Sequence, residues 1–416
     1  MRAWLKAAVV AVVALVAVPG AKAETLTDAL IAAYKNSHLL DQNRAVLRAA
    51  DEDVAVAVSA LRPVVAYTAQ AGWSRADVST AGGTTVVEGL SASLALSAEM
   101  TLFDFGRSKL GIEIAKESVL ATRQALIQVE QNVLLATVQA YVDVRLAQDV
   151  VALRQSNLRL ITQELRAAQD RFDVGEITRT DVSIAEARLA ASRAALAAAE
   201  GQLMIAREAY KAATGAYPGK LAPPPRAPAL PRTMEEAQGV ARGTHPLIRQ
   251  AQHQVTVADL QVDAAKAQRM PTIGAGVTLR TDDEDLQSSS VGLTMNQTLY
   301  AGGKLSALQR KALAGKDAAR AALQQTAVSV IENVGVAWAN LAVAAASIEA
   351  SDLQIRAAQA AFDGVREEAA AGTRTTLDVL DAEQELLDAR NARLEAEAQR
   401  YVAVYQVLST MGLLTV

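Results

Sequence analysis

The chain contains no cysteine and few aromatic residues, and each deficit excludes a class of structure. Its 416 residues include only 4 Phe and 3 Trp. Without cysteine there is no disulfide and no thiol chemistry. A hydrophobic fraction of 51% that alanine dominates favours long, closely packed helices over a bulky globular core. The net charge of −4 argues against nucleic acid as a partner.

Motifs for catalysis and metal binding are also missing from the sequence. The three histidines, His38, His245 and His253, have no metal-ligand spacing, and neither G-x-S-x-G nor H-E-x-x-H occurs. Gly302-Gly303-Lys304 lacks the upstream glycine and the following Ser or Thr of a phosphate-binding loop. We therefore predict that the protein is not an enzyme and uses no cofactor and no metal.

The N-terminus indicates export from the cytoplasm. Two basic residues precede an apolar run over residues 7–18, and Ala21-Lys22-Ala23 follows as a small-residue cleavage site. This pattern predicts a signal peptide over residues 1–23, with Glu24 as the first mature residue. No other continuous apolar stretch of about 18 residues occurs, so insertion of the mature chain into a membrane would require β-strands.

The mature sequence divides into two similar halves. A helical pattern over 25–60 ends before Pro63, and a second over 233–268 ends before Pro271, which is 208 residues later. We predict two structural repeats, residues 24–220 and 233–416. The Pro-rich segment 221–232 is predicted to be an extended linker between them.

Each half continues with a pair of predicted strands. Apolar and polar residues alternate with a period of two over 65–74 and 90–102, and again over 273–280 and 291–299. One face of each strand pair should therefore meet apolar surroundings and the other water. The connections 75–88 and 281–290 are polar and are predicted to be exposed loop tips.

The strand pattern allows two interpretations. One is a pair of ordinary hairpins on a soluble core. The other is a membrane barrel, but four strands are too few to close one, and lipid does not tolerate an open sheet edge. A membrane barrel would therefore be shared between chains, with about eight strands in a dimer or about twelve in a trimer.

Long helical segments follow both strand pairs. The stretches from Gly106 to Gly175 and from Gly303 to Gly372 each span 69 positions without proline, enough for helices of roughly 100 Å. Spacings of three and four predict coiled-coil packing. The predicted core positions are Leu146, Val150, Leu153, Asn157 and Leu160 on the first long helix, Ile184, Ala187, Ala191, Ala194, Ala198, Gly201 and Ile205 on its return arm, and Leu380, Leu387 and Leu394 on the second return arm.

The end of the second long helix carries the most distinctive sequence. Gly372 can end one helix in the left-handed conformation, and Thr375 or Thr376 can cap the next. Asp378 lies in the first turn of that helix, where the dipole favours negative charge, and Asp381 lies on the same face.

The first half repeats this turn 197 residues earlier. Gly175 corresponds to Gly372, Thr178 to Thr375, and Asp181 to Asp378, and Glu186 likewise matches Glu383. Ile184 occupies the place of Asp381, so only the second turn has the acidic pair.

These two turns resemble a known family. GTRTTLDVLDAEQEL and VGEITRTDVSIAEARL are similar to the periplasmic turns of TolC-type outer-membrane efflux and secretion channels, and the resemblance covers nearly the whole mature chain. It implies a mainly α fold with a transmembrane β-barrel, in which a homotrimer forms a twelve-stranded barrel and a long periplasmic coiled-coil α-barrel. It further implies a passive exit duct in the outer membrane of a Gram-negative bacterium, served by an inner-membrane transporter through a periplasmic adaptor.

The resemblance also assigns roles to particular residues. Asp378 and Asp381 would form an acidic ring at the periplasmic aperture, and Arg374, Thr180 and Asp181 would belong to a network that holds it closed. The structural alternative is that Asp378 only caps its helix and Asp381 is a solvated acid.

Other positions follow from the same resemblance. The turns at Gly175 and Gly372 would contact the adaptor. Phe103 and Tyr300 would lie near the membrane boundary, where aromatic residues are favoured. Ala369 stands where relatives have a tyrosine of the closing network, so closure should be weaker or differently wired.

Two short motifs add to the resemblance. Asn36-Ser-His-Leu39 and Thr244-His-Pro-Leu247 resemble the helix-break motif of the family, although each departs from it. The rival interpretation of the whole chain is a soluble periplasmic coiled-coil adaptor or structural rod, which would carry one hairpin between β-rich domains. The residues do not distinguish protein secretion from small-molecule efflux.

Overall fold

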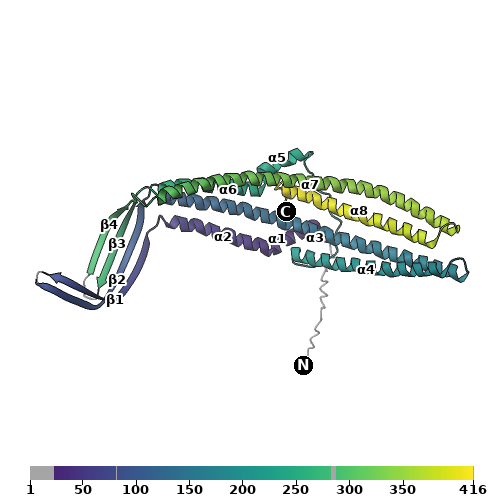
Figure 1. Ribbon diagram of the computed structural model, residues 1–416, viewed down its shortest axis with the longest axis horizontal. Coiled ribbons are helices and arrows are strands. Elements are labelled where there is room, and N and C mark those ends of the chain that lie inside the picture. The colour runs from purple at the N-terminus through teal and green to yellow at the C-terminus, as the bar shows by residue number, and fades with distance from the viewer. Residues whose placement is uncertain (1–22, 81, 283–286, 416) are drawn as a thin grey trace, which may run out of the picture.

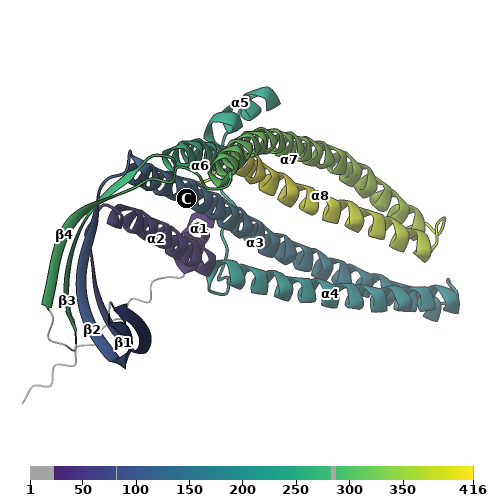
Figure 2. The same cartoon turned by 60° about the vertical axis from the view of Figure 1, so that its left-hand side comes forward.

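The fold is elongated, with a β-sheet at one end and the tips of two long helical hairpins at the other (Figure 1). The computed structural model describes residues 23–80, 82–282 and 287–415. The segment predicted to be the signal peptide lies outside these residues except for Ala23. Viewed from a second direction, the sheet curves away from the helices as a single layer (Figure 2).

Both halves of the chain have the same order of elements, helix–helix–strand–strand–helix–helix. The first half contains α1 (Leu26–Asn36), α2 (His38–Ser59), β1 (Val64–Thr80), β2 (Gly83–Phe103), α3 (Arg107–Asp173) and α4 (Arg179–Thr214). The second contains α5 (Met234–Thr244), α6 (Pro246–Ala267), β3 (Thr272–Asp282), β4 (Gln287–Asn296), α7 (Lys304–Ala370) and α8 (Thr376–Thr410).

The helix breaks suggested by the sequence are confirmed, and each is held by the end of a return arm. The Asn36 side chain donates a 2.8 Å hydrogen bond to the carbonyl of Thr214 at the end of α4. In the second half, Thr244 Oγ1 donates a 2.7 Å bond to the carbonyl of Met411. The breaks therefore satisfy carbonyls that the ends of α4 and α8 leave without helical partners.

The four strands form one antiparallel sheet in the order β1-β2-β3-β4. The register aligns Tyr67, Leu96 and Leu279 in one row, and Ser97 and Thr278 in the next. Neighbouring rows lie on opposite faces, so one face is apolar and the other is polar. Within one chain, β1 and β4 each leave one edge unpaired among the described residues.

The strands are longer than the alternation predicted. The segment 75–88 was expected to be a loop, but β1 and β2 run through nearly all of it, and Arg75 lies opposite Glu88 with a 3.8 Å ion pair. Polar side chains that lie opposite one another on paired strands can interact favourably, so a polar composition does not by itself indicate a loop. Conversely, β4 ends at Asn296, and Leu299 lies beyond it.

The two long helices are confirmed. The helices α3 and α7 are each 67 residues long, and each packs against its return arm, α4 or α8, as a hairpin (Figures 1 and 2). α7 is also the single described helix with an 18-residue window apolar enough to cross a membrane, with a mean hydropathy of 1.4. Its length is more than three times that needed for such a span.

Most of the packing face predicted for α4 is wrong, although Ile184 is half-buried and packs against the cluster around Leu165. Ala185, Ser192, Ala199 and Ala206 are buried, whereas Ile205 is 63% exposed. The other predicted positions Ala187, Ala191, Ala194 and Ala198 are also exposed. Alanine occurs on every side of α4, so no side of the helix is clearly more apolar than another. The bulkier residues of α3 therefore determine which side of α4 is buried. On α8, Leu380 and Leu387 are buried as predicted.

The centre of the molecule joins Glu24 to the predicted linker, residues 221–232. Glu24 pairs with Leu221 in an isolated parallel bridge. Tyr141 Oη donates a 2.7 Å bond to the carbonyl of Ala222, and Tyr210 Oη donates a 2.6 Å bond to Glu24. These buried tyrosines hold the start of the linker against α3 and α4.

Candidate functional site at the hairpin tips

Both hairpins end in the same kind of turn. Gly175 and Gly372 each have φ of +78°, a conformation that glycine adopts without a steric penalty. Apart from its two neighbours in the chain, neither has an atom of a described residue within 4 Å of the position that a Cβ would occupy. The two tips lie at the end of the molecule opposite the sheet (Figure 1).

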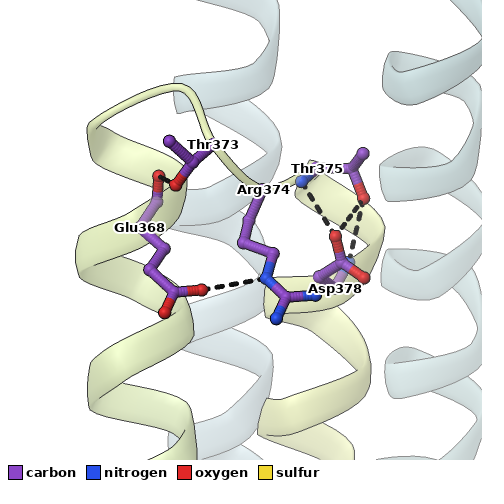
Figure 3. Close-up of polar contacts among 5 residues, drawn as sticks. All are labelled: Glu368, Thr373, Arg374, Thr375 and Asp378. Atoms are coloured by element: carbon purple, nitrogen blue, oxygen red, sulfur yellow. Dashed lines mark hydrogen bonds and ion pairs between the residues drawn. The ribbon is translucent and has the colours of Figure 1, made fainter.

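A reciprocal capping box begins each return helix. Thr375 N–H and Oγ1 donate to Asp378 Oδ2 at 2.9 and 2.8 Å, and the N–H of Asp378 donates to Thr375 Oγ1 at 3.3 Å (Figure 3). Thr178 and Asp181 form the same box in the first hairpin. The hydrogen bond from the Thr375 backbone is the main cause of a lowered pKa of Asp378, so this carboxylate stays ionised to a more acidic pH than an ordinary aspartate.

Removal of the Thr375 cap should loosen the start of α8. We expect Thr375→Ala to cost about 1 kcal/mol of local stability and to raise amide exchange in the first turn of α8 about fivefold. Hydrogen–deuterium exchange measures this change. Thr373→Ala is the matched control, since Thr373 Oγ1 donates to the carbonyl of Glu368 and takes no part in the box (Figure 3). Equal exchange in both variants would contradict the assignment.

Asp381 connects the two hairpins. Its carboxylate forms an ion pair with Arg188 of α4, 193 positions earlier in the chain. No local pattern in the sequence indicates this partner. Asp378 and Asp381 thus share one end of α8, but the first is engaged by its own helix cap and the second by the neighbouring hairpin.

The residues assigned to a closing network are not joined within one chain. Arg374 Nε donates a 2.9 Å bond to Glu368 at the end of α7 (Figure 3). Asp181 is engaged in its own capping box, and Thr180 is exposed beside it. Ala369 is buried on α7 and packs in one cluster with Phe362. The role of Glu368 as the partner of Arg374 was not predicted from the sequence.

The two aromatic residues expected at a membrane boundary lie where strands give way to long helices. Phe103 ends β2 and packs edge-to-face on Phe105, with 4.6 Å between ring centroids. Tyr300 follows β4 and is 86% exposed. Between the strand and α3, Asp104 accepts hydrogen bonds from Gly106 and Ser108 and so caps α3, whose N-cap glycine has no side chain to do so.

The histidines lie apart from the hairpin tips. His245 is buried as the N-cap of α6, and His253 forms a 2.8 Å contact with Glu117 of α3. His38 is exposed at the start of α2. Across the part of the chain that the structure describes, no three potential metal ligands form a cluster.

Comparison with known proteins decides the family. The model of the family described as outer membrane efflux protein matches residues 29–216 and 239–413. The chain belongs to this family. It is 36% identical to the outer membrane efflux protein BepC of Brucella suis over 405 residues, which cover 95% of this chain and 87% of that protein. It is 26% identical to the outer membrane protein TolC of Vibrio cholerae, with coverage of 94% and 92%.

Solved structures show the same fold. The outer membrane protein VceC of Vibrio cholerae superposes with a TM-score of 0.79 at 19% identity, over 93% of this chain and 96% of that chain. As a member of the outer membrane efflux protein family, this chain is an outer-membrane channel-tunnel. It serves as an exit duct and acts together with other components. The resemblance drawn from the two turns is confirmed.

Proposed function

We propose that three copies of this chain form the duct, with a twelve-stranded barrel in the outer membrane and a helical tunnel in the periplasm. The main support for this proposal is the four-stranded sheet. It has one apolar face, one polar face and two edges that are unpaired among the described strands, and open edges are not tolerated in lipid. Pairing β1 of one copy with β4 of the next removes every edge, and three sheets of four strands enclose a water-filled lumen.

At the periplasmic end, the proposed aperture is lined by Asp378 and Asp381 of each copy. Three chains bring six carboxylates together, which would attract cations. Arg374, Thr180 and Asp181 are proposed to hold this end closed through contacts between copies. Support comes from their shared position at the hairpin tips. In a single chain Arg374 and Thr180 are exposed and Asp181 is half-buried.

The duct itself is proposed to be passive. We assign the energy supply to an inner-membrane transporter. A periplasmic adaptor would connect the two by binding the turns at Gly175 and Gly372, which protrude at the end of each hairpin (Figure 1). The BepC relative is named as an efflux protein, so we propose efflux as the transport process, with type I protein secretion as the second candidate.

Two measurements test the trimer and the pore together. Light scattering of the detergent-purified protein should give three times the mass of the mature chain, and planar bilayers should show discrete conductance steps. A trivalent cation added on the side of the helical tips should block these steps, whereas the other side should be less sensitive. A soluble monomer without conductance would instead favour a coiled-coil adaptor or rod.

A further inference from the structure

A buried polar chain connects the two hairpins above their tips. Ser192 Oγ on α4 donates a 3.1 Å hydrogen bond to Asn157 Oδ1 on α3. Asn157 Nδ2 in turn donates a 2.8 Å bond to Glu383 Oε1 on α8. Glu383 is only 4% exposed, and the other two are each 8% exposed. Buried polar groups at a coiled-coil contact cost stability and usually serve specificity.

Within this Ser192–Asn157–Glu383 network, one carboxylate oxygen has no hydrogen-bond partner among the described residues. Glu383 Oε2 is buried and forms no hydrogen bond with any described residue. The carboxyl group therefore has a single donor, from Asn157. An ionised carboxylate with one donor is far more costly to bury than a neutral acid. Burial of Glu383 at this position therefore costs much less free energy when its carboxyl group is protonated.

Charges on the surrounding helices strengthen this preference. Burial and then the nearby carboxylate of Glu164 on α3 raise the pKa of Glu383 from 4.5 to about 7, whereas the Asn157 hydrogen bond lowers it. The guanidinium of Arg188 on α4 is already paired with Asp381. Towards α7, α8 presents apolar residues on either side of Glu383, Val379 one turn before it and Leu386 about one turn after it.

The same short stretch of α8 supplies two more contacts between the hairpins. Leu380 is buried in a cluster formed otherwise by α3 and α4, and Asp381 pairs with Arg188 of α4. If the hairpins move apart, Leu380, Asp381 and Glu383 lose their partners together. Exposure to water would then let Glu383 ionise at its ordinary pKa of 4.5.

We propose that Ser192, Asn157 and Glu383 form a proton-controlled clamp that holds the two hairpins of one chain together while Glu383 is neutral and loosens when Glu383 is charged. As a gating element the clamp rests on the proposed duct, whereas its action within one chain does not. The clamped form binds the proton more tightly than the released form. The stability of the clamp is therefore full below about pH 4.5 and is lost as the pH rises to about 7.

The absence of native cysteine makes the clamp directly measurable. Leu189 of α4 is 8% exposed within the cluster that contains Leu380, so the thiol of Leu189→Cys should react faster with a charged reagent when the hairpins separate and Leu380 withdraws. Ala187→Cys, at an exposed position on the same helix, corrects for the intrinsic effect of pH on thiol reactivity. The ratio of the two labelling rates reports the released population of the full-length protein.

We expect this ratio to rise at least tenfold between pH 5 and pH 8 when Glu383 is present. Glu383→Gln keeps an acceptor for Asn157 but cannot ionise, so its ratio should stay low and independent of pH. Asn157→Ala removes the donor and should raise the ratio at every pH. An identical pH profile in Glu383→Gln and the parent would overturn the clamp.

Bilayer conductance of the same variants separates the two proposals. Normal channels together with a labelling profile that ignores Glu383 would reject the clamp and leave the duct intact. A Glu383-dependent labelling profile without channels would retain the clamp and reject the duct.

Discussion

Gly412→Ala is expected to destabilise the protein by about 2–5 kcal/mol, more than the same substitution at Gly215 or Gly372. Gly412 has φ of +76°, and a Cβ there would lie 2.8 Å from His245 Cα and 2.9 Å from Pro246 Cδ. Both are fixed atoms of the α5–α6 junction, so relief requires moving the backbone. The left-handed conformation adds its own penalty for alanine.

Three glycines in the same conformation make a graded series. A Cβ at Gly372 meets no atom within 4 Å, so Gly372→Ala should cost only the conformational penalty of about 1–2 kcal/mol. A Cβ at Gly215 would approach the Asn36 side chain at 3.1 Å, which can move, so its cost should be intermediate. Thermal loss of the helical circular dichroism signal in detergent should follow this order. Equal midpoints for Gly372→Ala and Gly412→Ala would contradict the crowding argument.

The double variant Asp378→Asn/Asp381→Asn is expected to weaken block by a trivalent cation on the order of 100-fold, about 2.7 kcal/mol. Neutralising both residues in three chains removes six negative charges from the proposed aperture. Asparagine is the informative replacement at position 378, because its side-chain oxygen can still accept from the Thr375 N–H. Alanine there would also remove the helix cap and confuse the two effects.

Two further variants test whether weaker cation block results from the loss of charge at the aperture itself. Asp28→Asn removes the same kind of charge from the capping box at Thr25, at the start of α1, and should leave block unchanged. Arg188→Gln removes the cation paired with Asp381, so block should become tighter. Single-channel recordings measure all three. Unchanged block in the Asp378→Asn/Asp381→Asn protein would reject the acidic ring and leave Asp378 with its capping role alone.

The acidic ring and the clamp differ in their response to pH. Asp378 has a lowered pKa because of the Thr375 hydrogen bonds, so its charge persists down to acidic pH. Glu383 has a raised pKa of about 7 and changes charge near neutrality. Cation block and hairpin separation should therefore vary with pH over separate ranges.

Local features of this protein follow from the sequence alone, because each depends on neighbours along the chain. The 67-residue helices follow from long proline-free stretches. The turns follow from a glycine, found at φ of +78° in the structure, that precedes Thr and Asp at the spacing of a capping box. The alternation of polar and apolar residues in the strands reflects the period of an extended chain. The family was identifiable from the same turns.

Contacts between distant positions required the folded structure. The pairing of β2 with β3, the ion pair of Arg188 with Asp381 and the contact of Asn157 with Glu383 connect positions that no local pattern relates. A polar residue at the core position of Asn157 was a visible signal, but its partner was not. The packing face of α4 also came from the fold, since a helix lined with alanine takes its orientation from the larger side chains against which it packs.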